Sequence, residues 1–284
     1  MPEPKTATAP DPVAAHWAQV AASYDQVLET LRTKGLRPDE ATVRDLHAFD
    51  MLHMGGAAAT EDLGRRAALG KGEQVLDLGS GLGGPARLLA QTFGAQVTGI
   101  DLSPVLCDTA ERLTRLVGLQ DRVRFRCASA LNLPFDDGTF DLAVLQHLAM
   151  QIADKDLLFA EISRVTGKAS RLALHEIFAG TGPVHYPLPW APGPDLSALE
   201  SLDDCRDRLR GLGWKLDDVI DHSDAARRFH AKAVQVFDTA LRDGCGTDKF
   251  PPAAIPGQRA ISAAMVDNLA QGALKVGMLI ARRT

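Results

Sequence analysis

Short aliphatic runs alternate with amphipathic stretches through the middle of the chain. Runs rich in Val, Ile and Leu predict five strands, at Val75–Leu78, Gln96–Ile100, Val123–Cys127, Leu142–Gln146 and Leu172–Ile177. Between them, apolar residues recur with a helical period in Pro85–Phe93, Pro104–Val117 and Lys155–Val165. Helices in these positions serve as crossovers between parallel strands, so the pattern predicts an α/β fold with a doubly wound, mostly parallel sheet.

Other segments flank this central region. Residues 1–15 are rich in Pro and Ala and predict a disordered arm, and residues 16–70 predict a helical N-terminal lid. The core domain is expected over residues 71–284, where GWKLDDVID and LKVGMLIAR predict two closing strands and bring the total to seven. Insertions around 180–200, rich in Pro and Gly, and around 225–272, helical in pattern, are expected to cover a substrate.

The bulk composition is that of a soluble folded protein. Of 284 residues, 45% are hydrophobic and 24% are charged, which suits a globular chain with one sizeable core. The formal net charge of -5 comes without a block of like charges, which argues against a nucleic-acid partner. Neither a signal-peptide pattern nor an apolar run of roughly 18 to 20 residues is present, so no membrane partner is expected. We expect a cytoplasmic protein acting on a small molecule, with a homodimer as one option for its assembly.

The cysteines do not form a recognisable framework. Cys107, Cys127, Cys205 and Cys245 are widely spaced and include no C-x-x-C pair. This spacing favours incidental cytosolic thiols, and neither a disulfide scaffold nor a bound metal is expected.

A glycine-rich turn joins the first predicted strand to the helix after it, in VLDLGSGLGGPARLLA. Glycines at 79, 81 and 83 let the backbone turn sharply and approach a ligand closely. Gly79, Gly81 and Gly84 also satisfy the G-x-G-x-x-G pattern of dinucleotide-binding proteins. The glycines alone therefore leave two classes of cofactor open.

The charges and backbone N–H donors near this turn distinguish the two classes of cofactor. Asp101 ends the next strand, where its carboxylate can accept hydrogen bonds from the hydroxyls of an adenosine ribose, a contact common to both. Asp77 stands two residues before the first glycine, where a negative charge opposes a pyrophosphate but suits a methionine ammonium. Pro85 removes a backbone N–H that a phosphate would use. The balance favours S-adenosylmethionine over NAD.

The successive motifs VLDLGSGLGG, VTGIDLS, LNLPFDDGTFDLAVLQH and PLPWA resemble those of class I S-adenosylmethionine-dependent small-molecule methyltransferases. The resemblance runs from about Tyr24 to the C-terminus and implies a Rossmann-like methyltransferase fold. Within the class, DLHAFDMLHMGGAAATEDL and VHYPLPWA resemble the branch of sarcosine/dimethylglycine N-methyltransferases, with tocopherol-type and sugar O-methyltransferases as more distant relatives.

By position, the resemblance implies a set of cofactor-binding residues. They are Asp77, Gly79, Ser80, Gly81 and Gly83 around the methionine part, Asp101 and Leu102 at the ribose, Ser129, Ala130 and Leu131 at the adenine, and Gln146 beside the sulfonium. Two positions depart from the family. Ala128-Ser129-Ala130 replaces a GDA triplet, so the hydrogen bond to the adenine amino group must come from Ser129, the backbone or water. Gln151 stands where relatives often place His.

Candidates for chemistry lie at the carboxyl edge of the sheet and in the flanking loops. Methyl transfer is an in-line displacement that depends on positioning, and a base helps to remove the acceptor's proton. Candidate catalytic residues are His147, Gln146 and Tyr24, and candidate substrate-binding residues are His53, Gln151, His185, Tyr186 and Trp190. Because side chains alternate along a strand, we expect only one of Gln146 and His147 to point into the pocket. Packing alone is the alternative for His147, His175, His53 and Trp190, and Trp214 is expected in the core.

The leading hypothesis is transfer of a methyl group to the nitrogen of a small amine or amino acid. An alternative is an O- or C-methyltransferase that tailors a polyketide, sugar or isoprenoid quinol. A third is a non-catalytic cofactor-binding partner, suggested by the altered Ser129 and Gln151. A nicotinamide-dependent dehydrogenase is the remaining alternative.

Overall fold

The computed structural model describes residues 11–247, 250 and 252–284. Its centre is a seven-stranded sheet in the order β3-β2-β1-β4-β5-β7-β6, in which β7 runs antiparallel to both of its neighbours. The strands are β1 (Gln74–Leu78), β2 (Gln96–Asp101), β3 (Val123–Cys127), β4 (Leu142–Gln146), β5 (Arg171–Ala179), β6 (Trp214–Asp221) and β7 (Leu274–Arg283). The predicted mostly parallel seven-stranded sheet is therefore confirmed.

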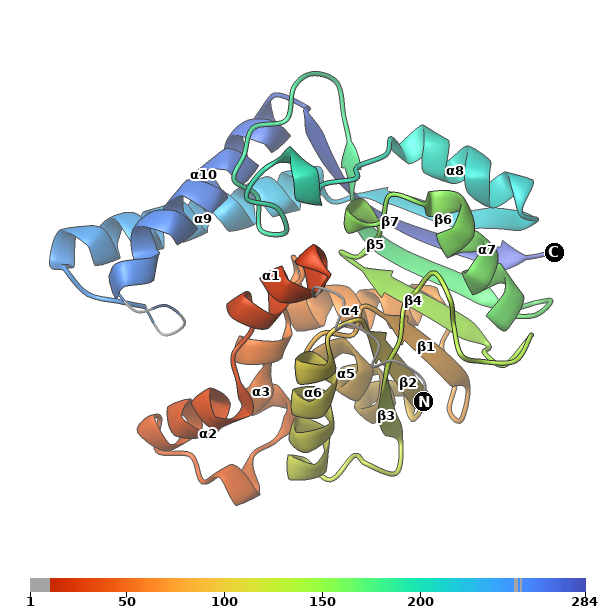
Figure 1. The fold of residues 1–284 in the computed structure, drawn as a ribbon, viewed down its shortest axis with the longest axis horizontal. Helices are drawn as coiled ribbons and strands as arrows, with labels where there is room; N and C mark the ends of the chain where they lie inside the picture. The colour runs from red at the N-terminus through yellow and green to blue at the C-terminus, as the bar shows by residue number, and fades with distance from the viewer. Residues whose placement is uncertain (1–10, 248–249, 251) are drawn as a thin grey trace, which may run out of the picture.

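Helices cover both faces of the sheet (Figure 1). On one face lie α4 (Gly56–Arg66), α5 (Gly84–Phe93) and α6 (Pro104–Leu116), and on the other α7 (Lys155–Val165) and α8 (Leu202–Gly211). Successive strand side chains point to opposite faces, so Val75 packs with α5 and Leu76 packs with α7. Burial on both sides explains why the central strands β1, β4 and β5 are nearly continuous apolar runs.

The N-terminal helices begin earlier than the sequence suggested. α1 (Pro12–Val20) starts inside the segment 1–15 that was expected to be a disordered arm. Asp11 caps this helix, since its Oδ1 accepts from Val13 N at 2.8 Å and Ala14 N at 3.2 Å. A Pro in the first turn also favours the helix. The prediction was wrong for residues 11–15, and residues 1–10 lie outside the described part of the chain.

The remaining N-terminal helices divide between two roles. α2 (Tyr24–Thr33) and α3 (Val43–Asp50) pack beside α6 through a separate apolar cluster that includes Leu31 and Leu46. α4 instead contributes Leu63 and Ala67 to the core on the sheet. The expected lid over residues 16–70 therefore mixes outer helices with one helix of the central layer.

The helical insertion forms a hairpin of α9 (Ser223–Asp243) and α10 (Ile255–Ala270) that extends away from the sheet (Figure 1). The Pro-rich segment between β5 and α8 packs against the base of this hairpin, where Trp190 lies in one cluster with Met265 and Leu269. Asn268 reinforces the contact, because its amide oxygen accepts from His185 N at 2.8 Å and its nitrogen donates to His185 O at 2.7 Å.

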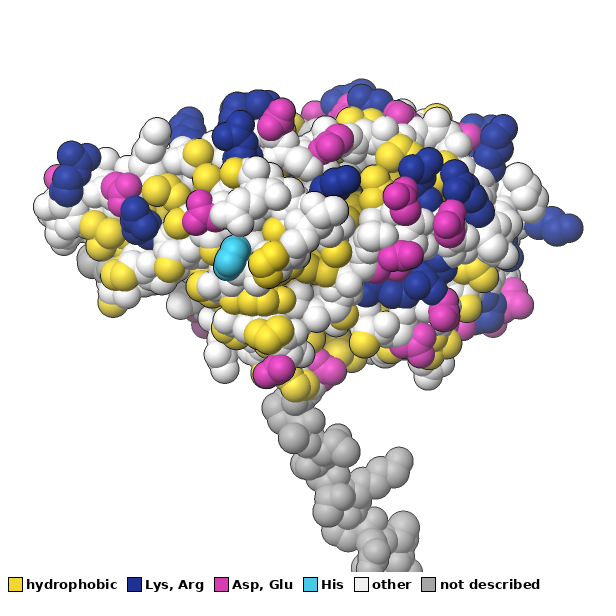
Figure 2. Space-filling model, turned by 90° about the horizontal axis from the view of Figure 1, so that it is seen from above, with side chains coloured by type: hydrophobic (Ala, Val, Ile, Leu, Met, Phe, Trp, Pro, Cys, Tyr) yellow, Lys and Arg dark blue, Asp and Glu magenta, His cyan; other side chains and the backbone are white. Residues whose placement is uncertain are grey.

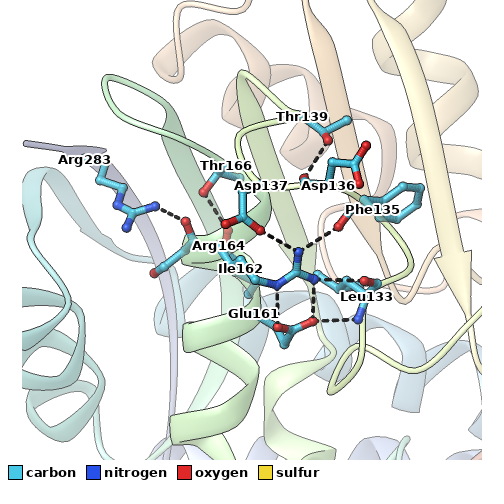
Figure 3. A network of polar contacts seen from close by, with 11 residues as sticks. Leu133, Phe135, Asp136, Asp137, Thr139, Glu161, Ile162, Arg164, Thr166 and Arg283 are labelled. Atoms are coloured by element: carbon cyan, nitrogen blue, oxygen red, sulfur yellow. Dashed lines mark hydrogen bonds and ion pairs between the residues drawn. The ribbon is translucent and has the colours of Figure 1, made fainter.

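The loop in LNLPFDDGTFD is fixed to α7 by two side chains, those of Arg164 and Glu161, as Figure 3 shows. Arg164 donates to Phe135 O at 2.7 Å and to Leu133 O at 2.9 Å, and its Nε donates to Glu161 Oε1 at 2.8 Å. Glu161 Oε2 in turn accepts from Leu133 N at 2.7 Å. These contacts hold the chain that follows β3 and borders the cavity described next.

Candidate active site

A cavity of about 430 Å³ lies at the carboxyl ends of β1, β2 and β4. In this sheet the strand order reverses between β1 and β4, and open α/β sheets bind ligands at such a reversal. Of the residues predicted to bind the cofactor, ten line the cavity: Asp77, Gly79, Ser80, Gly81, Asp101, Leu102, Ser129, Ala130, Leu131 and Gln146.

The glycine-rich turn brings backbone directly to the cavity wall. Gly79 and Gly81 have φ of 71° and 52°, a region that L side chains rarely occupy. A Cβ on Gly79 would stand 2.9 Å from Leu148 Cδ1, so this position has no room for a side chain. Gly83 was predicted to bind the cofactor, but it does not line the cavity. It adopts φ of 80° at the start of α5, where a Cβ would lie 2.4 Å from Phe125 Cζ.

Two carboxyl groups face the cavity beneath this turn. Asp77 is 2% exposed, and its Oδ2 is buried without a hydrogen-bond partner in the described residues. Burial, together with the neighbouring charge of Asp101, raises the pKa of Asp77 to about 7. Burial likewise raises the pKa of Asp101. Two desolvated acids side by side form a site in which a bound cation would be stabilised and a bound anion would be repelled.

Asp101 is oriented by the backbone. Its Oδ2 accepts from Gly81 N at 3.0 Å and its Oδ1 accepts from Ser103 N at 2.9 Å. A carboxylate has about four acceptor positions, so both oxygens can still accept from the hydroxyls of a diol. At the adjacent wall, Ser129 Oγ accepts from Leu131 N at 3.2 Å, which leaves the hydroxyl hydrogen of Ser129 available.

Gln146 and His147 both line the cavity, so the expectation that only one would do so was wrong. His147 follows the last residue of β4 and has φ of 58°, which breaks the alternation of a strand. Its backbone N donates to His175 O at 3.0 Å. Burial and three neighbouring histidines hold the pKa of His147 well below its usual range, so the imidazole is neutral near pH 7.

His53 also lines the cavity, and its tautomer follows from its contacts. Its Nε2 lies 3.0 Å from Gly56 O and 3.0 Å from Thr60 Oγ1. A carbonyl oxygen can only accept, so Nε2 carries the hydrogen and Nδ1 keeps a lone pair. Thr60 Oγ1 then donates to Gln146 Oε1 at 3.0 Å. Burial lowers the pKa of His53 to about 4, so this imidazole is neutral as well.

Helix α1 contributes to the cavity wall, which the sequence analysis missed. Trp17 lines the cavity and its Nε1 donates to Gln151 Oε1 at 3.0 Å. Gln151 also lines the cavity, and its Nε2 donates to Trp190 O at 3.3 Å. Asp11 and Asp154 complete this side of the wall. The pair Asp11-Pro12, the cap and the first residue of α1, is a helix-start signal that could have revealed this helix.

Four of the predicted catalytic and substrate-binding residues do not line the cavity. Tyr24 packs on α6, with the Arg112 guanidinium 3.8 Å from its ring centre. His185, Tyr186 and Trp190 do not line the cavity. Trp190 is 1% exposed and its Nε1 donates to Ser197 Oγ at 3.3 Å, so it anchors its loop. Among the described residues, none that lines the cavity comes from 180–200 or 225–272.

Comparison with known families finds a match over the segment that forms most of the cavity wall. A sequence profile described as "Methyltransferase domain" matches residues 76–174, which include most of β1, all of β2, β3 and β4 and most of the cavity wall. This segment is therefore similar to a methyltransferase domain. S-adenosylmethionine is the cofactor of this family, and solved structures with the same fold hold it or S-adenosylhomocysteine.

Curated relatives of this segment are named as methyltransferases. Methyltransferase GfsG from Streptomyces halstedii is 34% identical over 166 residues, which cover 56% of this chain and 58% of that protein. A probable tocopherol O-methyltransferase, chloroplastic, from Oryza sativa subsp. japonica is 38% identical over 104 residues, 37% of this chain and 29% of the relative. The matched segments thus span less than two thirds of either relative.

Solved structures place the methyltransferase domain in the predicted fold class. A provisionally assigned sarcosine dimethylglycine methyltransferase from Galdieria sulphuraria matches with a TM-score of 0.69 at 20% identity, over 80% of this chain and 85% of that one. The [4+2]-cyclase SpnF has the same fold, with a TM-score of 0.63 and 23% identity over 93% of this chain and 97% of its own. The fold alone therefore does not determine the reaction.

Proposed function

We propose that the chain is an S-adenosylmethionine-dependent methyltransferase that acts on a small molecule. The observation that carries the proposal is the pair of buried carboxyl groups, Asp77 and Asp101, at the wall of a cavity beside the glycine-rich turn. S-adenosylmethionine carries positive charge on its sulfonium and ammonium groups, which these acids complement. The pyrophosphate of NAD would bring negative charge to the same place.

The residues present fit the parts of this cofactor. Asp101 would accept from the ribose hydroxyls, and Asp77 would face the ammonium group. Ser129, Ala130 and Leu131 border the adenine position implied by the family. When bound, S-adenosylmethionine supplies an electrophilic methyl group, and the protein's task is to orient the acceptor and exclude water.

Two neutral imidazoles are available to receive the acceptor's proton. His147 and His53 both line the cavity, and burial lowers the pKa of each. A neutral imidazole has one nitrogen with a free lone pair, which can accept a proton or a hydrogen bond. This arrangement supports a nucleophile that must lose a proton, and a hydroxyl depends on such a base more than an amine does.

The wall also limits the class of acceptor. Its side chains are largely apolar, including Trp17, Leu52, Leu148 and Ile152, and no lysine or arginine is among the described residues that line it. A carboxylate on the acceptor would therefore lack a partner. We propose as first candidate an apolar molecule methylated on a hydroxyl oxygen, such as a phenol or quinol.

A nitrogen acceptor, the leading hypothesis from sequence, is the second candidate. Asp11 and Asp154 at the cavity would attract a protonated amine as it enters. Named relatives and structural neighbours include O-, N- and C-methyltransferases, so they do not decide between the atoms.

Turnover assays test the proposal. Purified protein is incubated with S-adenosylmethionine and a panel of alkyl phenols, hydroquinones, primary amines and glycine, and S-adenosylhomocysteine is measured by mass spectrometry. We expect release with the phenols or hydroquinones and little with glycine. Binding of the cofactor without release on any acceptor class would instead favour the non-catalytic alternative.

Assembly and location are predicted from the sequence alone. No helix in residues 11–247, 250 and 252–284 is long and apolar enough to cross a bilayer. Figure 2 shows Lys and Arg side chains interspersed with Asp and Glu on the face it presents, without the large basic area that nucleic acid would need. A cytoplasmic location and a homodimer remain predictions from the sequence.

A further inference from the structure

Three imidazoles lie in series between the cavity and the protein surface. His147 follows β4, His175 lies in the neighbouring strand β5, and His222 caps α9 after β6. The ring centres of His147 and His175 are 5.2 Å apart, and those of His175 and His222 are 5.3 Å apart. His175 Nε2 is 3.3 Å from His222 Nδ1, within hydrogen-bond distance.

The series has one gap, between the rings of His147 and His175, and each of these rings has a nitrogen without a hydrogen-bond partner that the structure describes. Among the described residues, His147 Nε2 and His175 Nδ1 are both buried and both lack a hydrogen-bond partner. Buried polar atoms without a partner are uncommon, and such a pair in adjacent rings can be joined by a small shift or by one water. A continuous hydrogen-bonded path would then run from the cavity wall to His222.

Solvent access rises at the outer end of the series. His175 is 2% exposed, whereas His222 is only half-buried. His222 also directly follows a carboxylate, because Asp221 is the last residue of β6. The outer ring is therefore open to water and adjacent to an acid, whereas the inner rings are enclosed by protein.

We propose that His147, His175 and His222 form a proton relay that carries the acceptor's proton from the cavity to solvent. The inference rests on the proposed function. Methylation of a neutral hydroxyl breaks the sulfur–methyl bond, forms an oxygen–methyl bond and frees one proton, so the positive charge moves from sulfur to that proton. In a buried site the charge needs a route to water.

The transfers balance if each imidazole starts with its hydrogen on Nε2. His147 Nδ1 takes the acceptor's proton while His147 Nε2 gives its own to His175 Nδ1. His175 Nε2 then donates to His222 Nδ1, the contact at 3.3 Å, and His222 Nε2 releases a proton to water. Each ring ends neutral with its hydrogen on Nδ1. Once the product has left and water has entered the cavity, the reverse transfers restore the starting tautomers: water gives a proton to His222 Nε2, and His147 Nδ1 gives one to water in the cavity.

The other two histidines near His147 do not extend this path. The tautomer of His53 is fixed by Gly56 and Thr60, and His230 Nε2 lies 3.3 Å from Met54 Sδ, a poor proton acceptor. His175 is buried and does not line the cavity, so contact with a ligand does not explain an imidazole at this position. A proton path does explain it, because His175 lies between His147 and His222.

The first test uses His222→Ala and, as a matched control, His185→Ala, an exposed histidine outside the series. Turnover is measured with the fastest acceptor of the panel above, and binding of S-adenosylhomocysteine is measured by calorimetry. We expect His222→Ala to lose about tenfold or more in kcat, with cofactor affinity unchanged, and added imidazole to restore much of the loss. Wild-type turnover in the variant, or a loss that imidazole does not restore, would overturn the relay.

A second test needs no acceptor and so separates failure of the relay from failure of the proposed function. Nitrogen-15 spectra of the histidine rings are recorded with S-adenosylhomocysteine bound. We expect His175 to carry its hydrogen mainly on Nε2 and to change its tautomer balance in His222→Ala. A spectrum of His175 that is identical in the two proteins would contradict the relay, even if the wild-type enzyme proves inactive on every acceptor.

Discussion

At the scale of single residues, the site depends on acids that are costly to bury. Asp77 is the second-last residue of β1 and has an oxygen without a partner among the described residues, and Asp101 accepts from two backbone N–H groups. Such groups destabilise the empty protein when ionised, and that cost is offset when a cation binds. The arrangement is therefore better explained by ligand binding than by folding.

The raised pKa of Asp77 predicts a pH-dependent affinity for S-adenosylmethionine. Below a pKa of about 7 the carboxyl is mostly protonated, and the bound cation favours the ionised form. The affinity for S-adenosylmethionine should therefore rise about fivefold to tenfold between pH 6 and 7.5, because at the higher pH the cation no longer has to displace a proton from Asp77. Calorimetric titrations across this range measure the effect, and Asp77→Asn should remove it. A variant that keeps the full pH dependence would show that another group is responsible.

The acids could be predicted from the sequence because local order places them. Asp77 and Asp101 stand at the ends of apolar runs beside a glycine motif, so strand period and motif together fix their position. His175 and His222 could not be brought together in this way. Their rings meet through pairing of β5 and β6 with β7, and nothing in the local sequence specifies that pairing.

At the scale of elements, one arginine links the loop after β3 to α7. Arg164 donates to two loop carbonyls and forms an ion pair with Glu161. The side chain of Arg164 is two thirds buried, and that of Glu161 is 15% exposed. Arg164→Ala should lower the free energy of unfolding by about 2 kcal/mol, because buried carbonyls lose their donor. Chemical denaturation followed by circular dichroism measures the change. Arg32→Ala, which breaks an exposed pair with Glu29, is the control and should change stability little.

Helix α1 is expected to control access to the cavity. Trp17 both lines the cavity and donates to Gln151, so Trp17→Ala removes apolar contact and a hydrogen bond at the same place. We expect release of S-adenosylhomocysteine to become about tenfold faster in stopped-flow measurements. Val20→Ala, on the exposed side of the same helix, should leave the rate unchanged. Equal rates in the Trp17 variant and the wild type would exclude α1 from this role.

The loops show where element-level prediction fails. The Pro-rich segment around Trp190 was expected to cover a substrate because such loops often follow the fifth strand. Trp190 is instead buried against α10, and the hydrogen bonds of His185 to Asn268 fix the segment there. An aromatic residue in a Pro-rich stretch has the same sequence signature whether it binds a substrate or anchors the loop. Only its contact with a residue distant in the chain distinguishes these two roles.

At the scale of the whole molecule, stability is expected to be uneven. The outer end of the α9–α10 hairpin has its own small apolar cluster, formed by Phe237, Ala240 and Ile255 away from the sheet. Phe237→Ala should therefore increase hydrogen exchange in the hairpin without weakening cofactor binding, because none of the described hairpin residues lines the cavity. Val236→Ala, at a 46% exposed position, is the control. A matching loss of protection in β1 and β4 would show that the hairpin and sheet unfold together.

The general architecture was accessible from the sequence, because alternating strands and helices restrict the topology and the glycine motif locates the cavity. The class of methyl acceptor could not be predicted from the sequence. The cavity wall comes from α1, the His53 segment and the residues after β4, which are far apart in the chain. Their joint shape depends on tertiary packing. The apolar wall without a lysine or arginine among its described residues emerged only from the structure.

Calorimetric titration of wild-type and Asp101→Ala protein with S-adenosylmethionine and with NAD tests the central claim most directly. We predict binding of S-adenosylmethionine to the wild type, at least about tenfold weaker binding to the variant through loss of the ribose contacts, and no measurable binding of NAD. Tighter binding of NAD than of S-adenosylmethionine, or an Asp101→Ala variant with unchanged affinity, would contradict the account.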